Sequence, residues 1–300
     1  MMPMKWLKVR TMAGEDLKHR SKPWKKILWA FWKNKTAVIG AILLFFGVIP
    51  VAILAPFISP HDPYSQKADL ALKKPNPMNL FGTDMYGRDI LSRIIFGTRV
   101  SLMVGLGSVL VGVFLGTILG LVAGYFGGRI DDILVRVIDI FMSFPTLLLG
   151  LMFITVMGPG VKNLIISIGL ALTPRIARIA RGSTISIREY EFVLACRAIG
   201  MGHFRIMFHH ILPNIFGDIV VMGTLWCATA IILEANFSFI GLGVQPPIPS
   251  WGQMIRSGVD YLGNAPWLWI FPGFSILIAV LSFNMIGDGL RDIADPKLRG

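Results

Sequence analysis

The residues of this chain that could bind a metal are few and are spread along the sequence. Three histidines, His203, His209 and His210, fall between two long apolar runs. Spacings of six and seven residues with no cysteine ligand do not resemble a metal site. Cys196 and Cys227 fall in a predicted loop and a predicted membrane span, so they offer no disulfide framework. We therefore expect this chain to bind no metal and no cofactor.

The signatures of common catalytic sites are also absent. The chain has no G-x-x-x-x-G-K-[ST] loop to cradle a nucleotide, no H-E-x-x-H and no C-x-x-C, and its apolar runs contain no Ser/His or paired-Asp arrangement. Glu234 is the only acid deep within an apolar run, where an unpaired charge costs ~2.5 kcal/mol or more. Two interpretations of Glu234 remain open: a hydrogen bond to a neighbouring helix, or a position lining a substrate pathway. We expect a chain without catalytic activity of its own.

The composition indicates which elements must position these residues. The 300 residues are 54% hydrophobic and 15% charged, with a mean hydropathy of +0.66, which lies outside the range of soluble globular domains. Disordered, collagen-like and secreted disulfide-rich chains are excluded, because the apolar residues form blocks long enough to cross a bilayer. The sequence predicts an all-α, polytopic membrane protein.

Six segments meet the requirement of roughly 20 apolar residues per transmembrane helix. They are residues 36–58, 100–126, 140–161, 163–180, 219–244 and 265–286. The fourth is interrupted by Pro174, Arg175 and Arg178, so a re-entrant segment is an alternative there. That alternative would place the two termini on opposite sides of the membrane.

The distribution of positive charge supports six spans and explains the net charge of +12. With both termini inside, 21 of the 29 lysines and arginines fall on the cytoplasmic side. Short cytoplasmic loops of membrane proteins are enriched in these residues. The charge therefore reflects topology, and we expect no nucleic-acid partner. We expect a multi-pass membrane protein with both termini in the cytoplasm.

The predicted organisation has five parts. Residues 1–35 form a cytoplasmic tail, in which Trp24, Ile27, Leu28 and Phe31 alternate with lysines as in a helix that lies on the lipid headgroups. The first transmembrane helix (36–58), which we expect to remain uncleaved, is followed by an extracytoplasmic loop (59–99), a five-helix core (100–288) and a cytoplasmic C-terminal tail (289–300).

The second predicted span contains a helix-packing surface. Gly112, Gly116, Gly120, Gly124 and Gly128 recur at every fourth residue, which removes side chains from one helical face. Another helix backbone can then approach closely. Whether the neighbouring helix belongs to this chain or to a second chain stays open at this point.

A short amphipathic helix is predicted in the cytoplasmic loop at 181–213. Phe192, Cys196 and Ile199 fall on one face at i, i+4 and i+7, Ala195 and Ala198 lie beside them, and Gly200 ends the helix. Small residues would allow this helix to enter a groove of another protein and act as a lever. Folding back onto the spans of its own chain is the alternative, and the residues alone do not decide between the two.

The same loop carries a family resemblance. Residues 195–214, ACRAIGMGHFRIMFHHILPN, resemble the cytoplasmic signature of ABC importer permeases, in which E-A-A is followed by three residues, a glycine, nine residues and I-x-L-P. Ala195, Gly200, Leu212 and Pro213 match this signature, whereas Leu194, Cys196 and His210 depart from it. The segments at 82–93, 237–252 and 283–299 resemble signatures of the C-type permease subunit of dipeptide, oligopeptide and nickel importers.

This resemblance implies the six-span architecture of a type I ABC importer permease, in the cytoplasmic (inner) membrane of a bacterium or archaeon. It also implies four kinds of partner: a B-type permease subunit, two cytoplasmic ATPase subunits that bind ATP and Mg, an extracytoplasmic substrate-binding protein, and membrane lipid. The residues that it assigns to ATPase coupling are Glu191, Ala195, Cys196, Arg197, Ala198, Gly200, Leu212 and Pro213. Peptides are the expected substrates, with nickel or other metal chelates as the alternative within the family. An ion-coupled secondary transporter is a further alternative, for which Glu234 alone offers little support.

Overall fold

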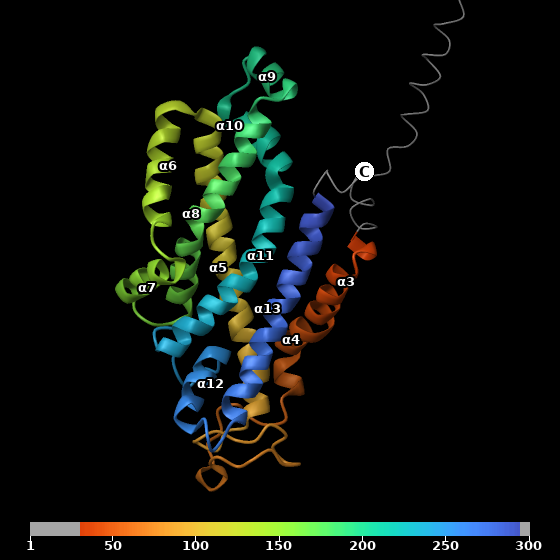
Figure 1. The fold of residues 1–300 in the computed structure, drawn as a ribbon, viewed down its shortest axis with the longest axis vertical. Helices are drawn as coiled ribbons and strands as arrows, with labels where there is room; N and C mark the ends of the chain where they lie inside the picture. The colour runs from red at the N-terminus through yellow and green to blue at the C-terminus, as the bar shows by residue number, and fades with distance from the viewer. Residues whose placement is uncertain (1–30, 295–300) are drawn as a thin grey trace, which may run out of the picture.

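The computed structural model describes residues 31–294, and these residues form a bundle of long helices (Figure 1). The interfacial helix predicted before residue 31 and the end of the C-terminal tail lie outside the described residues. The elements that make up the bundle are, in order, α3 (Lys35–Ile42), η1 (Leu43–Val48), α4 (Ile49–Ile58), α5 (Ile90–Phe126), α6 (Gly128–Met142), α7 (Thr146–Met157), α8 (Val161–Arg188), η3 (Ile206–Ile211), α11 (Leu212–Ile240) and α13 (Trp267–Ala294). Shorter elements are η2 (Ala68–Leu70), α9 (Glu191–Ala198), α10 (His203–Arg205), α12 (Trp251–Gly258) and η4 (Val259–Tyr261).

Within the described range, five helices are long and apolar enough to cross a membrane. They are Lys35–Ile58, Ile90–Phe126, Val161–Arg188, His203–Ile240 and Trp267–Ile293. The fourth predicted span is a continuous helix, α8, so the re-entrant alternative is wrong for that segment. Inside a bilayer, helices of this kind satisfy every backbone polar group internally, which explains why the apolar runs fold in this way.

The third predicted span, 140–161, is not one helix. The segment consists of α6 and α7, which bend by 92° where they meet, and the count reaches six if this bent pair forms one span. Pro145 explains the break, because proline disfavours helical backbone at Phe144 and itself adopts an extended ψ of 135°. Several other boundaries also differ from the prediction: α5 begins at Ile90 instead of residue 100, α8 ends at Arg188 instead of residue 180, α11 spans Leu212–Ile240 instead of 219–244, and α13 ends at Ala294 instead of residue 286.

Two π-helical segments precede prolines near the start of a helix. Segment η1 ends two residues before Pro50, and η3 ends two residues before Pro213. Proline lacks an N–H and its ring clashes with the carbonyl of the preceding turn, so a locally widened turn accommodates it without ending the helix. The L-P pair of the predicted signature therefore lies within one helix that continues from His203 to Ile240.

The centre of the bundle is the pair formed by α5 and α8, which lie side by side and are covered by α11 and α13 (Figure 1). Ile168 and Leu172 of α8 are completely buried in the main core cluster, together with Ile231 and Phe237 of α11. Both described chain ends point toward the end of the bundle that carries α9 (Figure 1). The two ends are joined by a hydrogen bond from Asn34 Nδ2 to Asp292 Oδ2 of 3.1 Å.

Candidate functional site

The helix predicted in the cytoplasmic loop exists as α9, Glu191–Ala198, and it projects from one end of the bundle (Figure 1). Glu191 lies in its first turn and Arg197 in its last turn, the arrangement that the helix dipole favours. Gly200 ends the helix with φ of +76°, a conformation that glycine adopts without strain. Gly200 N donates to Arg197 O at 3.0 Å and Met201 N donates to Cys196 O at 3.0 Å, which together form a Schellman motif.

The two faces of α9 differ from the predicted stripe. Val193 is the residue that α9 buries completely, and Cys196 packs beside it on the cluster that contains Ile206 and Ile211. Ile199, expected on the same face as Cys196, is instead 76% exposed. The helix thus rests on its own chain through Val193 and Cys196, on a cluster to which α5 and α11 also contribute.

The remaining coupling candidates are distributed over two places. Five of them, Glu191, Ala195, Arg197, Ala198 and Gly200, are exposed on α9 and its terminal turn. Leu212 and Pro213 lie at the start of α11, where Leu212 packs on the same cluster as Cys196. The structure therefore gathers small, exposed residues on the outer side of α9, and it places the L-P pair at the base of the loop.

The glycine face of α5 packs against α8 of the same chain. A Cβ atom at Gly112 would lie 3.0 Å from the carbonyl oxygen of Gly169, and one at Gly116 would lie 2.8 Å from Ile176 Cβ. At Gly120 it would lie 2.7 Å from Ala180 Cβ, and at Gly124 it would lie 2.7 Å from Thr184 Cβ. The distances at Gly116, Gly120 and Gly124 are shorter than Cβ contacts in folded proteins, and the distance at Gly112 is at the tight end of their range, so the four glycines allow the two backbones to meet. The fifth glycine of the repeat, Gly128, has open space around it.

Charged side chains of α8 pair with α6. Arg181 Nε and NH2 donate to the two carboxylate oxygens of Asp131 at 2.5 and 2.6 Å. Arg178 pairs with Asp139 on the next turns of the same two helices. Sequence reasoning placed Arg178 within the fourth span and Arg181 in the following loop, and it did not consider the acids of α6 as their partners. These acids were the available signal, since charged side chains avoid lipid.

Glu234 is fully buried where three helices meet. Ser101 Oγ of α5 donates to Glu234 Oε2 at 2.9 Å, and Ser238 Oγ donates to Oε1 at 2.8 Å. The backbone N–H of Trp251, the first residue of α12, points at Ser101 Oγ across 3.5 Å. This geometry supports the interpretation that Glu234 is hydrogen-bonded to a neighbouring helix. Its role in a substrate pathway stays a prediction.

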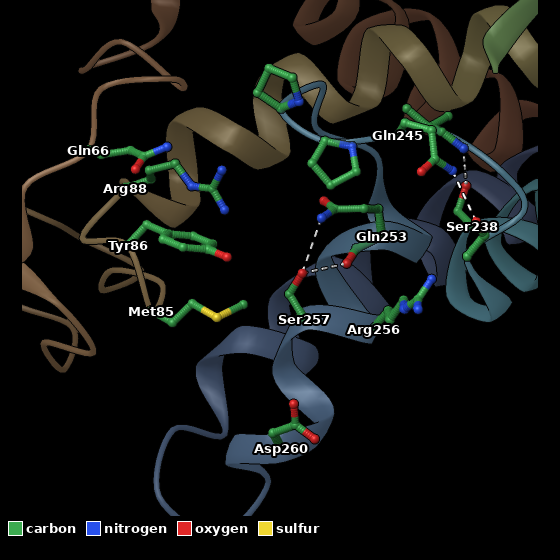
Figure 2. Close-up of a pocket in the computed structure, with 14 residues that line it drawn as sticks. Gln66, Met85, Tyr86, Arg88, Ser238, Gln245, Gln253, Arg256, Ser257 and Asp260 are labelled. Carbon is green, nitrogen blue, oxygen red and sulfur yellow. Dashed lines mark hydrogen bonds between the residues drawn. The ribbon is translucent and has the colours of Figure 1, made fainter. Parts of the chain in front are cut away.

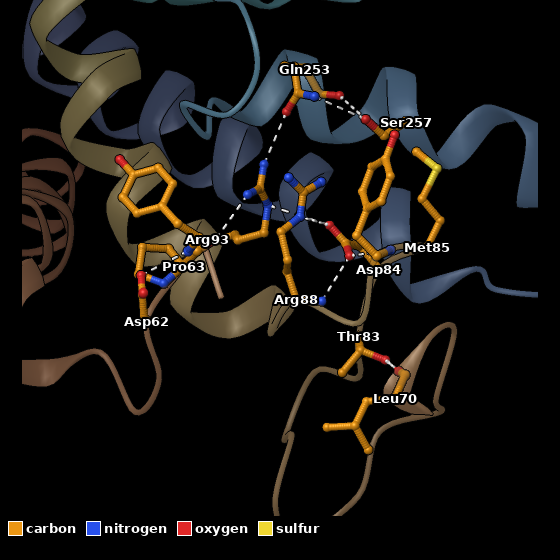
Figure 3. A network of polar contacts seen from close by, with 12 residues as sticks. Asp62, Pro63, Leu70, Thr83, Asp84, Met85, Arg88, Arg93, Gln253 and Ser257 are labelled. Carbon is orange, nitrogen blue, oxygen red and sulfur yellow. Dashed lines mark hydrogen bonds and ion pairs between the residues drawn. The ribbon is translucent and has the colours of Figure 1, made fainter. Parts of the chain in front are cut away.

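The segment before α5, residues 59–89, and the first turn of α5 are held together by buried charges that sequence reasoning missed (Figure 3). Asp84, Arg88 and Arg93 are each at most 5% exposed. Arg88 Nε donates to Asp84 Oδ2 at 2.6 Å, and Arg93 NH2 donates to Gln253 Oε1 of α12 at 3.4 Å. Arg93 NH1 also donates to the carbonyl oxygen of Pro63 at 3.0 Å. Arg93, which was expected in a loop, therefore lies in the first turn of α5 and connects Pro63 of this segment to α12.

A polar cavity of about 570 Å³ opens beside this network (Figure 2). One wall of the cavity includes Tyr86 and Arg88, from the segment before α5. The other wall includes Gln253 and Arg256 of α12 and Asp260 of η4. Ser238, the hydrogen-bond partner of Glu234, also borders the cavity. The buried carboxyl group is thus separated from the outer cavity by a single side chain.

The residues considered for metal binding are not grouped together. His203 bonds through Nδ1 to the hydroxyl group of Tyr125 at 2.8 Å, and Cys227 is buried in the main core. Among residues 31–294, no group of three or more His, Cys, Asp or Glu side chains could hold a metal ion.

Two models of known protein families match this chain, one in each part of the sequence. Residues 112–300 match the family model described as the inner membrane component of binding-protein-dependent transport systems. Residues 22–75 match the N-terminal TM domain of oligopeptide transport permease C.

Three curated relatives align over most of the chain. The dipeptide transport system permease protein DppC of Alkalihalophilus pseudofirmus is 42% identical over 95% of this chain and 93% of its own length. The di/tripeptide transport system permease protein DppC of Pseudomonas aeruginosa is 39% identical, and it covers 92% of this chain and 93% of its own length. The glutathione transport system permease protein GsiD of Pectobacterium atrosepticum is 38% identical, with 92% of each chain covered.

Among solved structures, a chain of the MetNI methionine ABC transporter aligns with a TM-score of 0.57 at 20% identity. It covers 69% of this chain and 98% of its own length, and at this identity the likeness concerns the fold alone. The fold is that of a type I importer permease, as the sequence resemblance implied. The chain belongs to the family of inner membrane components of binding-protein-dependent transport systems.

Proposed function

We propose that this chain is one of two permease subunits of an ATP-driven importer that carries peptides across the cytoplasmic membrane. The second subunit is a B-type permease, two cytoplasmic ATPase subunits bind ATP and Mg, and an extracytoplasmic binding protein delivers the substrate. The chain itself contributes no catalytic group. Both termini and the loop that carries α9 face the cytoplasm, where ATP is found.

The observation that carries this proposal is the position of α9. The helix stands at the end of the bundle, rests on its own chain through Val193, and exposes Ala195, Ala198 and Gly200 outward. A helix with small exposed residues can enter a groove on an ATPase subunit without overpacking. Movement of the ATPase subunits would then displace α9 and shift the bundle between two arrangements with different access.

The proposed substrates are di- and tripeptides, because the relatives at 42% and 39% identity are named for transport of peptides of this size. Glutathione is a second candidate, since the relative named for glutathione transport covers an equal share of the chain. The polar outer cavity, with Arg256 and Asp260 among its lining residues, is compatible with the zwitterionic ends of such molecules.

Uptake of a labelled dipeptide into sealed cells tests this function. Cells that produce all subunits should accumulate the label as long as they contain ATP, and collapse of the ion gradients should leave uptake intact. Uptake that follows the ion gradient in ATP-depleted cells would instead establish a secondary transporter. Competition by unlabelled glutathione or unlabelled tripeptide decides between the two substrate candidates.

A further inference from the structure

The last turn of α5 is held rigidly against α8. Gly124 lies so close to α8 that a Cβ atom there would approach Thr184 Cβ to 2.7 Å and the carbonyl oxygen of Arg181 to 2.9 Å. The next residue, Tyr125, is only 4% exposed and packs in the cluster that supports α9. This turn is therefore a fixed point at the end of the bundle from which α9 projects.

The chain that enters α9 is attached to this turn. Arg188, the last residue of α8, donates from NH1 to the carbonyl oxygen of Gly124 at 2.8 Å. Its Nε donates to Glu189 Oε1 at 2.8 Å, so the guanidinium group is oriented from both sides. The entry to the loop thus cannot move independently of the end of α5.

The chain that leaves α9 is attached to the same turn. The hydroxyl group of Tyr125 and Nδ1 of His203, the first residue of α10, are 2.8 Å apart. Arg197 of α9 lies over the Tyr125 ring, with its guanidinium carbon 5.0 Å from the ring centroid. Tyr125 therefore contacts α9 itself as well as the segment that follows it.

Between these attachments lies a turn that could absorb movement. Gly200 and Gly202 flank Met201 with no side chain of their own, and a Cβ atom at either glycine would meet no other atom within 4 Å. A displacement of α9 relative to His203 would bend this turn. Because Tyr125 contacts both Arg197 of α9 and His203, it holds the two sides of the turn at one point of α5, and a displacement of α9 is passed to α5 and, through its glycine face, to α8.

We infer that Tyr125 is a positioning residue which couples movement of α9 to the α5–α8 pair, through its hydrogen bond to His203 and its contact with Arg197. This inference rests on the proposed function, because it takes α9 as the element that the ATPase subunits move. It assigns a role to Tyr125 and His203, which lie outside the residues carried over from the family signature.

The test uses membranes that contain the whole transporter and compares three variants. Tyr125→Phe keeps the ring beneath Arg197 and removes the hydroxyl group, His203→Ala removes its partner, and His203→Asn places an amide group near the position of Nδ1. The first two should raise the ATP hydrolysed per peptide imported by about two- to tenfold, the factor that corresponds to loss of one hydrogen bond. His203→Asn should stay near the wild-type ratio.

Two further measurements separate positioning from general damage. Hydrogen exchange of the amides at 191–198 should accelerate in Tyr125→Phe and in His203→Ala, while the amount of assembled complex stays unchanged. The double variant should be no worse than either single variant, because both remove one shared bond. Tyr261→Phe, which removes a tyrosine hydroxyl group at the other end of the bundle, is the matched control and should change neither readout.

The outcomes distinguish this inference from the proposed function. Unchanged exchange and an unchanged ATP-to-peptide ratio in both Tyr125→Phe and His203→Ala would overturn the role of Tyr125 and leave docking through α9 intact. Effects of the two substitutions that add in the double variant would overturn the shared bond. If Ala195→Trp retains the ATPase subunits and normal uptake, docking through α9 fails, and the role of Tyr125 in coupling fails with it.

Discussion

Arg181 and Asp131 form a two-point ion pair that joins α8 to α6, with N–O distances of 2.5 and 2.6 Å. Asp131 is 15% exposed and Arg181 is 30% exposed at the side chain, so the pair is partly shielded from water. The paired geometry matches the planar guanidinium group to both carboxylate oxygens, which a lysine cannot reproduce. The pair holds the charged helix α6 in place on one side of the bend at Pro145.

Arg181→Lys should therefore weaken the attachment of α6, although it keeps the charge. We expect a loss of about 1–2 kcal/mol of stability for Arg181→Lys and a larger loss for Arg181→Ala. Thermal unfolding of the purified complex measures both. A double-mutant cycle with Asp131→Ala should give a clear coupling energy, and purely additive effects would show that the pair contributes nothing.

The close contact between the glycine face of α5 and α8 predicts that two Gly→Ala substitutions change the stability of the protein in opposite directions. In an exposed helix, Gly→Ala stabilises by about 1 kcal/mol, because alanine has the better helix propensity. Gly217→Ala should follow this rule, since a Cβ atom there meets nothing within 4 Å. Gly120→Ala should instead destabilise, because its Cβ atom would lie 2.7 Å from Ala180 Cβ.

The measurement is the yield and thermal stability of the complex for both alanine variants. Gly116→Leu and Gly120→Leu extend the series and should reduce the amount of assembled permease, because packing is the main attraction between helices in lipid. Normal assembly of both leucine variants would contradict the close packing of α5 on α8.

The substitution Glu234→Gln should alter transport without affecting assembly of the complex. Glu234→Gln keeps one oxygen acceptor, and the hydroxyl group of Ser101 or Ser238 can rotate to accept from the new amide. We expect normal complex yield with altered uptake. Glu234→Ala should lower stability as well, because it leaves both serine hydroxyl groups buried and unpaired. Unchanged uptake in Glu234→Gln combined with a lower Tm would show that the residue is only structural.

Asp84 forms ion pairs with Arg88 and Arg93, and we expect it to hold the segment before α5 in place. Asp84→Asn removes the negative charge from between Arg88 and Arg93, which are 4% and 1% exposed. Loss of one partner from a buried ion pair costs about 3–5 kcal/mol. Limited proteolysis within residues 59–89 should accelerate in this variant. Equal cleavage rates in the variant and the wild type would show that Asp84 does not hold this segment.

Local patterns made part of this structure predictable. The helix α9 and its end at Gly200 follow from apolar spacing and from the conformational freedom of glycine, both of which act within one turn. The close-packing face from Gly112 to Gly124 is visible in the same way, although its partner is not, because α8 lies dozens of residues further along the chain.

Long-range effects account for what the sequence did not reveal. The sequence places Arg93 in a loop, because its partner Gln253 is 160 positions away and gives no local signal. The bend at Pro145 was hidden by the apolar residues on both sides, which satisfy the length of a span whether or not the helix is continuous. Ile199 was predicted to share a face with Phe192 and Cys196. It is exposed instead, because the residue that α9 buries is Val193.

The proposal that α9 is the docking helix for an ATPase subunit is tested most directly by capture of the ATPase subunits with permease variants. Ala195→Trp enlarges an exposed small residue, and an added side chain in a close interface costs ~1–3 kcal/mol. Gly200→Val also strains the turn, which has φ of +76°. Gly263→Val, at the other end of the bundle with open space around it, is the control.

The measurement is the amount of ATPase subunit retained by each membrane-inserted variant, together with peptide uptake in the same cells. Ala195→Trp and Gly200→Val should be inserted normally but retain less ATPase and import less peptide, whereas Gly263→Val should retain ATPase subunits as the wild type does. Full retention and normal uptake with both Ala195→Trp and Gly200→Val would contradict the assignment of α9 as the docking helix.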